Sequence, residues 1–252
     1  MKSAAFFDLD RTLMAGSSGL HWARAGARAG LISRRRLAAD AWENIQFRLQ
    51  GSTDESTARV RDRVGELIRG RRVVEFERLA PMVLAGVLPR VYPQMLEVAY
   101  GHQDEGRPVY IVTAASHATA EMIAHVLGFD GGLGTELEED GNGVYTGRLD
   151  GPFNYGEGKP QRMRELAEAE GISLDQSYGY SDSASDLPML RAVGHPVAVN
   201  PDSELARVAA EEGWEVMRFE TLGRRLRVAV ALMAMAMAGT AGRRIVQVRS
   251  SR

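Results

Sequence analysis

Two aspartates, Asp8 and Asp10, follow the first apolar run of the chain in the stretch FFDLDRTL, at residues 6–13. Carboxylates this close repel each other, and burial strengthens the repulsion, so such a pair is best tolerated beside a cation. Carboxylate oxygens suit Mg²⁺, which keeps open positions for phosphate oxygens. One carboxylate can then attack phosphorus, because the metal screens it from the charge of a phosphate ester.

Two later apolar runs also end in side chains suited to this chemistry. Thr113 and Ser116 end the run that begins at residue 107, and Asp182 and Asp186 follow the run at 176–181. Lys159 opens the helical pattern that comes just before that second run. A hydroxyl and an ammonium can hold the equatorial oxygens of a phosphoryl group as charge spreads in the transition state.

Lys159 stands out because lysine is rare in this chain. Of the 31 basic residues only Lys2 and Lys159 are lysines, and the others are arginines. Lysine is a compact point charge on a flexible stem, which suits contact with a single phosphoryl oxygen. A cation at a helix start is also disfavoured by the helix dipole, so we interpret Lys159 as functional.

The elements that must position these groups follow from periodicity. Residues 4–9 read as a strand, residues 14–90 show helical periodicity, and strands then alternate with helices from residue 91. This predicts an α/β fold with a Rossmann-like doubly wound parallel sheet core and an inserted all-helical cap domain. We expect the core at 1–13 and 91–220, the cap at 14–90 and a C-terminal helical extension at 221–252. A strand, a turn and a second strand are predicted over 132–149.

Composition limits the classes of protein to consider. The 252 residues are 44% hydrophobic and 25% charged, which is typical of a globular protein. The absence of cysteine excludes disulfides, thiolate zinc sites and a cysteine nucleophile. A net charge of −2 gives no argument for nucleic acid, and we predict no such partner. The N-terminus reaches charge too early for a signal peptide, which predicts a cytoplasmic protein.

An uncharged stretch, Val228–Gly242, lies in the predicted extension between two groups of arginines. It is too short and too rich in small residues for a confident assignment as a bilayer span. A helix lying on a membrane surface is one interpretation. We favour a helix that docks on the core or on a partner.

Each candidate group also has a structural explanation. Asp8 and Asp10 could form an ordinary turn in which Asp10 caps a helix. Asp182 and Asp186 could be a turn residue and a cap, and Thr113 could cap the helix that follows it. In open α/β sheets, ligands bind at the carboxyl ends of the strands. Because all these groups fall at that one predicted edge, we favour a shared chemical role.

The ordered set of motifs resembles the haloacid dehalogenase superfamily, in its phosphoserine-phosphatase-like branch. The matching segments are DLDRT at 8–12, VTAAS at 112–116, Lys159 and YSDSASD at 180–186. The helical block at 14–90 is similar in position to the cap of that branch. The resemblance implies a phosphatase that acts on a small-molecule phosphate ester.

The resemblance implies roles for the first two motifs. Asp8 would be the nucleophile that forms an aspartyl-phosphate. Asp10 would protonate the leaving alcohol and then activate water, and Thr12 would orient Asp10. Thr113 and the backbone around Ala114 would bind the phosphoryl oxygens.

It also implies a charge-balancing lysine and a Mg²⁺ site. Lys159 would offset charge on Asp8 and on the phosphoryl group. Asp182 would ligate Mg²⁺ together with Asp8 and the backbone carbonyl of Asp10, and Asp186 would support the site. One position departs from the family pattern, which often has asparagine where this chain has Ser185.

The substrate should be selected by the cap. Phosphoserine-specific members of this branch resemble one another in placing a glutamate early in the cap, but this chain has no carboxylate between Asp10 and Asp40. We therefore expect a substrate other than phosphoserine, although a phosphoserine phosphatase stays an alternative. A phosphotransferase or mutase would use the same motifs. A regulatory protein on an inherited fold would have no need to keep Asp8, Asp10, Lys159 and Asp182 together.

Overall fold

The computed structural model describes residues 2–31, 62 and 65–219. The chain divides into two compact units, Met1–Val216 and Met217–Arg252, and nearly all of the described residues belong to the first. The helical extension predicted at 221–252 lies outside the described residues. None of the helices in the described ranges is long and apolar enough to cross a membrane.

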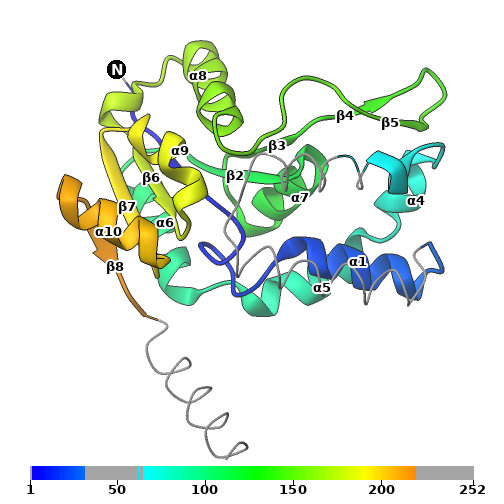
Figure 1. Cartoon of the computed structure of the whole chain (residues 1–252), viewed down its shortest axis with the longest axis horizontal. Coiled ribbons are helices and arrows are strands. Elements are labelled where there is room, and N and C mark those ends of the chain that lie inside the picture. Colours follow the sequence, from blue (N-terminus) through cyan, green and yellow to red (C-terminus); the bar gives the residue numbers. More distant parts are fainter. Residues whose placement is uncertain (1, 32–61, 63–64, 220–252) are drawn as a thin grey trace, which may run out of the picture. The chain divides into compact units, whose positions relative to one another are not determined.

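A six-stranded sheet with the order β3-β2-β1-β6-β7-β8 forms the centre of the first unit (Figure 1). The pairs β1–β2, β1–β6, β2–β3 and β6–β7 are parallel. Parallel neighbours need crossover connections, which helices supply here, so the predicted α/β fold is confirmed. The strands are β1 (Ala5–Phe7), β2 (Val109–Ser116), β3 (Gly131–Thr135), β6 (Tyr178–Ser181), β7 (His195–Val199) and β8 (Glu215–Met217).

Both faces of the central strand β1 are buried, because successive side chains point to opposite sides of the sheet. Phe6 belongs to an apolar cluster that includes side chains of three helices of the core. Phe7, on the other face, stacks on Tyr180 with ring centroids 4.3 Å apart. The core helices are α6 (Pro93–Asp104), α7 (His117–Leu127), α8 (Gly158–Glu170), α9 (Leu187–Arg191) and α10 (Ser203–Glu212).

Glycines let strand β3 pack closely against helix α7. A Cβ atom at Gly132 would lie 2.3 Å from the backbone carbonyl carbon of Ala120, and one at Gly134 would lie 2.6 Å from the Cα of His117. Such distances leave no room for a side chain. The glycine-rich sequence of β3 therefore reflects close packing on the helix.

The described residues between β1 and β2 are mainly helical, as predicted. They form α1 (Ser18–Arg28), α4 (Val73–Glu77), α5 (Ala80–Val87) and the short 3₁₀ helix η1 (Leu88–Arg90). Helices α1 and α5 approach closely, because a Cβ at Gly86 would lie only 2.2 Å from Nδ1 of His21. The division of the chain into a cap at 14–90 and a core stays a prediction.

The strand–turn–strand predicted over 132–149 is divided differently. Its first part joins the parallel sheet as β3, and a separate antiparallel hairpin follows, formed by β4 (Leu137–Glu139) and β5 (Tyr145–Leu149). The hairpin also pairs with the helical block, since the amide of Gly70 donates to the Tyr145 carbonyl at 2.8 Å. The single run was predicted because the turn after Thr135 carries no glycine or proline.

Candidate active site

The strand order brings the predicted site residues to one edge of the sheet. Asp8 directly follows β1, and Asp182 directly follows β6, which pairs with β1 in parallel. Thr113 lies near the end of β2, the neighbour of β1 on its other side. The carboxyl ends of three adjacent strands therefore carry the predicted motifs, as the sequence indicated.

Lys159 connects two of the carboxylates. Its Nζ lies 2.7 Å from Oδ1 of Asp8 and 2.7 Å from Oδ2 of Asp186. The lysine is the second residue of α8 and is only 2% exposed. Asp186 also accepts a hydrogen bond of 2.7 Å from the Ser181 hydroxyl, and its side chain makes no helix-capping bond. The simple capping role considered for Asp186 is therefore wrong.

Thr12 lies between Asp8 and Asp182. Its hydroxyl is 3.0 Å from Oδ2 of Asp8 and 3.5 Å from Oδ1 of Asp182, and it accepts a 3.0 Å hydrogen bond from the Asp182 amide. The Thr12 hydroxyl therefore lies between the two carboxylates and contacts both of them. This corrects the contact expected for Thr12, which touches these two residues instead of orienting Asp10.

Asp10 is held by the start of helix α1. The Ser17 hydroxyl donates to Oδ2 of Asp10 and the Ser18 amide donates to Oδ1, each at 2.8 Å. Neither serine belongs to one of the predicted motifs. Serines before an amphipathic pattern indicate a helix start, and that signal could have suggested the contact. Asp10 thus does contact a helix N-terminus, as its structural explanation had it, while remaining half-buried beside the cluster.

Thr113 and Ala114 are not joined to the carboxylates by a direct contact that the structure records. The Thr113 hydroxyl accepts from the Ala115 amide at 3.2 Å, and the Thr113 carbonyl accepts from Nδ2 of Asn154 at 2.9 Å. The pairing register of β2 with β3 shifts between Val112 and Ser116, so the strand is irregular here. Phosphate binding by Thr113 and Ala114 stays a prediction.

Burial shapes the electrostatics of the cluster. It raises the pKa of Asp8 to about 7, even though the Lys159 ammonium acts in the opposite direction. It also raises the pKa of Asp182 to about 8, against the influence of the Arg11 guanidinium. Burial would lower the pKa of Lys159, but the carboxylates of Asp186 and Asp8 outweigh it, and that pKa lies above its ordinary value.

The three buried carboxylates of Asp8, Asp182 and Asp186 contact two cations, Lys159 and Arg11, so their negative charge exceeds what these cations balance, a condition that a divalent cation relieves. In the described part of the chain, no three His, Asp or Glu side chains converge closely enough to hold a metal by themselves. The predicted set adds a main-chain carbonyl, at Asp10, to the carboxylates of Asp8 and Asp182. These are hard oxygen donors, and they fit Mg²⁺.

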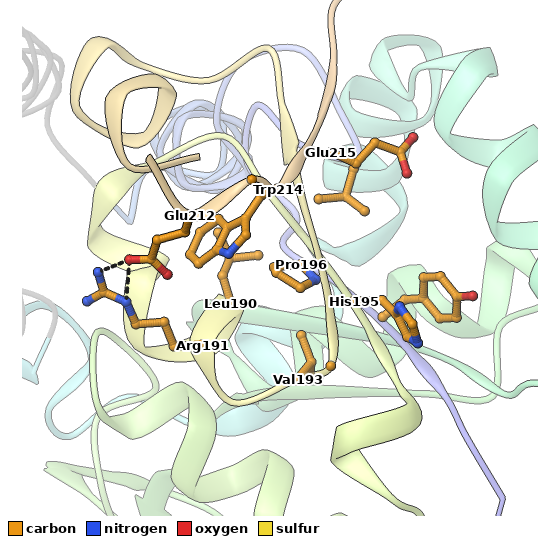
Figure 2. Close-up of a pocket in the computed structure, with 12 residues that line it drawn as sticks. Leu190, Arg191, Val193, His195, Pro196, Glu212, Trp214 and Glu215 are labelled. Atoms are coloured by element: carbon orange, nitrogen blue, oxygen red, sulfur yellow. Dashed lines mark hydrogen bonds and ion pairs between the residues drawn. The ribbon is translucent and has the colours of Figure 1, made fainter. Parts of the chain in front are cut away.

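A separate cavity of about 480 Å³ lies elsewhere on the sheet and contains none of the predicted site residues. Tyr178 and His195, the first residues of β6 and β7, contribute to it, so it lies toward the amino ends of those strands. Figure 2 shows Trp214 in its lining and the pair formed by Arg191 and Glu212 at one side. The cavity therefore lies away from the carboxylate cluster.

Comparison with known proteins places the chain in a family. A family model described as haloacid dehalogenase-like hydrolase matches residues 5–191. The chain is 35% identical to a Mycobacterium tuberculosis protein named phosphoserine phosphatase SerB1, over 100% of this chain and 82% of the relative. It is 32% identical to a histidinol-phosphatase of Neisseria meningitidis serogroup C, over 87% of this chain and 100% of the relative.

Solved structures agree. A Bordetella pertussis Tohama I protein of unknown function has a TM-score of 0.75 and 28% identity, covering 86% of this chain and 98% of its own. A substrate-bound phosphoserine phosphatase shares the fold, with a TM-score of 0.62 and 18% identity over 90% of this chain and 98% of that one. The resemblance seen in the motifs is confirmed, and the chain belongs to the haloacid dehalogenase-like hydrolases.

Proposed function

We propose that the chain, as a phosphatase of this family, hydrolyses a small-molecule phosphate monoester with Mg²⁺ and through an aspartyl-phosphate on Asp8. The observation that most supports this is the buried Lys159 ammonium, 2.7 Å from both Asp8 and Asp186. A buried cation shared by two carboxylates is costly to assemble for stability alone. Its position beside the proposed nucleophile gives it a chemical use.

Asp8 is placed to attack phosphorus. Lys159 and Thr12 contact its two carboxylate oxygens and fix its orientation. In the first step, an Asp8 oxygen forms a bond to phosphorus while the bond from phosphorus to the leaving oxygen breaks. The Lys159 ammonium favours the ionised carboxylate and would offset charge on the phosphoryl oxygens.

Asp10 is placed to move the proton. It would give a proton to the leaving oxygen in the first step, and then take one from the water that attacks the aspartyl-phosphate and releases inorganic phosphate. The two donors at the start of α1, Ser17 and Ser18, hold its carboxylate in one orientation.

Mg²⁺ would be held by Asp8, Asp182 and the backbone carbonyl of Asp10. When bound, it supplies a Lewis acid that screens the nucleophile from the negative ester. Asp182 is well suited to this role because it is 3% exposed and its Oδ2 is contacted by the half-exposed guanidinium of Arg11, at 2.9 Å. Asp186 would support the site indirectly, because it holds the Lys159 ammonium in place.

The proposed substrate is a phosphate monoester other than phosphoserine. Residues 11–31 contain no carboxylate that could meet a substrate ammonium, and the start of α1 is occupied with Asp10. The named relatives include both a phosphoserine phosphatase and a histidinol-phosphatase. Comparison of kcat/KM for phosphoserine, histidinol phosphate, lysophosphatidate and sugar phosphates tests this. A preference for phosphoserine over all others would contradict it.

The central test is the Asp8→Asn variant with a generic aryl phosphate. Because Asn cannot form the acyl phosphate, we expect kcat to fall at least about 1,000-fold. Asp104→Asn, at an exposed position, should retain wild-type activity. Wild-type activity in the Asp8→Asn variant would exclude Asp8 as nucleophile. Release of phosphate without transfer to added sugars would separate hydrolysis from the phosphotransferase alternative.

A further inference from the structure

Arg11 occupies an unfavourable backbone conformation next to the carboxylate cluster. Its φ angle is +69°, and the only other non-glycine residue with a positive φ in the described ranges is Asn200. Asparagine tolerates this region, whereas a long side chain such as arginine is uncommon there. A strained residue beside a functional site usually has a use that offsets the strain.

The side chain of Arg11 reaches Asp182. Its Nη2 lies 2.9 Å from Oδ2 of Asp182, an ion-pair distance. The contact is uneven, because the Arg11 side chain is 45% exposed and that of Asp182 is 4% exposed. The guanidinium therefore has open solvent to move into, whereas the carboxylate is fixed.

The charges around Asp182 leave it dependent on this contact. Asp8, Asp186 and Asp202 lie near enough to repel it. Lys159, the buried cation of the cluster, is already shared by Asp8 and Asp186. Within the described residues, Arg11 is thus the one cation recorded in contact with Asp182.

We propose that Arg11 is the counter-ion of Asp182 in the metal-free protein and that Mg²⁺ must displace it, so that Arg11 sets the affinity of the site for metal. This rests on the proposed function, since it takes Asp182 as a metal ligand. One oxygen cannot be fully engaged by a guanidinium and by a small, closely coordinated dication. The half-exposed arginine is the partner that can leave.

The test is Mg²⁺ binding to the full chain without substrate, measured by titration calorimetry in the wild type and in Arg11→Gln. Glutamine carries the same backbone penalty without the charge, so the comparison isolates the guanidinium. We expect Arg11→Gln to bind Mg²⁺ about two- to fivefold more tightly, as loss of a competing, partly exposed ion pair predicts. Arg11→Lys should stay close to wild type. Arg207→Gln, which removes an exposed arginine paired with Glu211, should not change the affinity.

Thermal unfolding provides a second readout. Without metal, Arg11→Gln should melt at a lower temperature than wild type, and with saturating Mg²⁺ the two should melt together. The loss should vanish in an Asp182→Asn background, because the pair is then already broken. An equal loss there would mean that Arg11 stabilises something else, and would overturn the inference.

The binding results separate this inference from the proposed function. If the wild type binds Mg²⁺ and Arg11→Gln binds it equally or more weakly, only the inference is overturned. An increase in KM with unchanged Mg²⁺ affinity would assign Arg11 to substrate binding and would also overturn it. If the wild type binds no Mg²⁺, the proposed function fails and takes the inference with it.

Discussion

Buried titratable groups lie at both ends of the parallel strands, and the two ends stabilise them differently. At the carboxyl end, the buried Lys159 pairs with Asp8 and Asp186, and Arg11 pairs with the buried Asp182. At the other end, near the start of β2, His102 lies buried between Tyr180 and Arg107. Burial and the Arg107 guanidinium lower the pKa of His102 to about 4, so this histidine is neutral.

The hydrogen bonds around His102 show how neutrality is achieved. Arg107 can only donate, so Nδ1 of His102 accepts from its Nε at 2.7 Å. The proton of the neutral ring is therefore on Nε2, which lies 2.7 Å from the Tyr180 hydroxyl. The amino end of the sheet thus keeps its buried histidine neutral. The carboxyl end instead buries ion pairs, which are weak contributors to stability. That contrast supports the proposal that the carboxyl end is the reactive one.

The largest effect should come from Lys159→Met, which removes the shared cation of the charged end. The variant leaves Asp8 and Asp186 buried without their shared cationic partner, which should lower the free energy of unfolding by about 3–5 kcal/mol. Urea denaturation at pH 8 measures this. Lys2→Met, at the exposed other lysine, is the matched control.

The deficit of Lys159→Met should shrink as the pH falls, because protonation removes the charge that the variant leaves unpaired. With Lys159 present, the pKa of Asp8 is about 7 and the ammonium lowers it, so in the variant the pKa moves higher and the deficit should begin to shrink above pH 7. Equal stability of Lys159→Met and Lys2→Met at pH 8 would show that the buried carboxylates do not depend on Lys159 for stability. The contrast between the two ends would then be wrong.

A second, smaller effect concerns acid sensitivity at the neutral end. In the unfolded chain His102 titrates near its ordinary pKa of 6.5, whereas in the folded protein its pKa is about 4. Between these values only the unfolded state binds the proton, so stability falls with decreasing pH by up to about 1.4 kcal/mol per unit. His102→Gln should lose this slope, as measured by urea denaturation between about pH 6.5 and pH 4.5.

The exposed His125 provides the control for that experiment, since His125→Gln should keep the wild-type slope. Stability that rises on acidification in the wild type but not in His102→Gln would mean that His102 is stabilised by its charge. Both ends of the sheet would then stabilise their buried groups by charge pairing.

A modest effect on catalysis is expected from Ser17→Ala. Loss of the 2.8 Å hydrogen bond leaves Asp10 with the Ser18 amide and a wider range of orientations, so kcat should fall about three- to tenfold with an aryl phosphate. The melting temperature should change little, because Ser17 makes no side-chain capping bond to its helix. Ser203→Ala, at an exposed helix start, is the control, and equal kcat values in both variants would remove Ser17 from the mechanism.

The smallest effect is predicted at the cavity. Arg191 and Glu212 form an exposed ion pair there, and such pairs contribute little. Arg191→Ala should leave both the free energy of unfolding and the phosphatase activity close to those of the wild type. A clear loss of activity would connect this cavity to the carboxyl end and would require a coupling between them.

Sequence reasoning reached Asp8, Lys159, Asp182 and Asp186 because a topological rule sends strand ends to one edge, and strand ends can be read from periodicity. It also predicted the alternation of strands and helices that makes the sheet. It was wrong about the contacts of Thr12, because a residue in a tight loop can face either neighbour. The path of that loop depends on packing that no local pattern records.

The contact of Arg11 escaped for a related reason. Its backbone conformation is one that arginine seldom adopts, so no local propensity predicts where its side chain points. Ser17 was missed because its partner, Asp10, precedes it by seven residues, across the turn that leads from β1 into α1. That the motifs lie close together at one edge of the sheet was predictable from the sequence. Which further residue each carboxylate contacts was not.

The close approach of α1 and α5 gives a remote residue access to the chemistry. A methyl group at Gly86 would collide with the ring of His21, which is 8% exposed and has little room to turn aside. Helix α1 would have to shift, and its first residues are the ones that hold Asp10. In the proposed mechanism, proton transfer from Asp10 to the departing alcohol would therefore depend on the spacing of two helices, and one carbon atom added on α5 would slow cleavage of the ester bond.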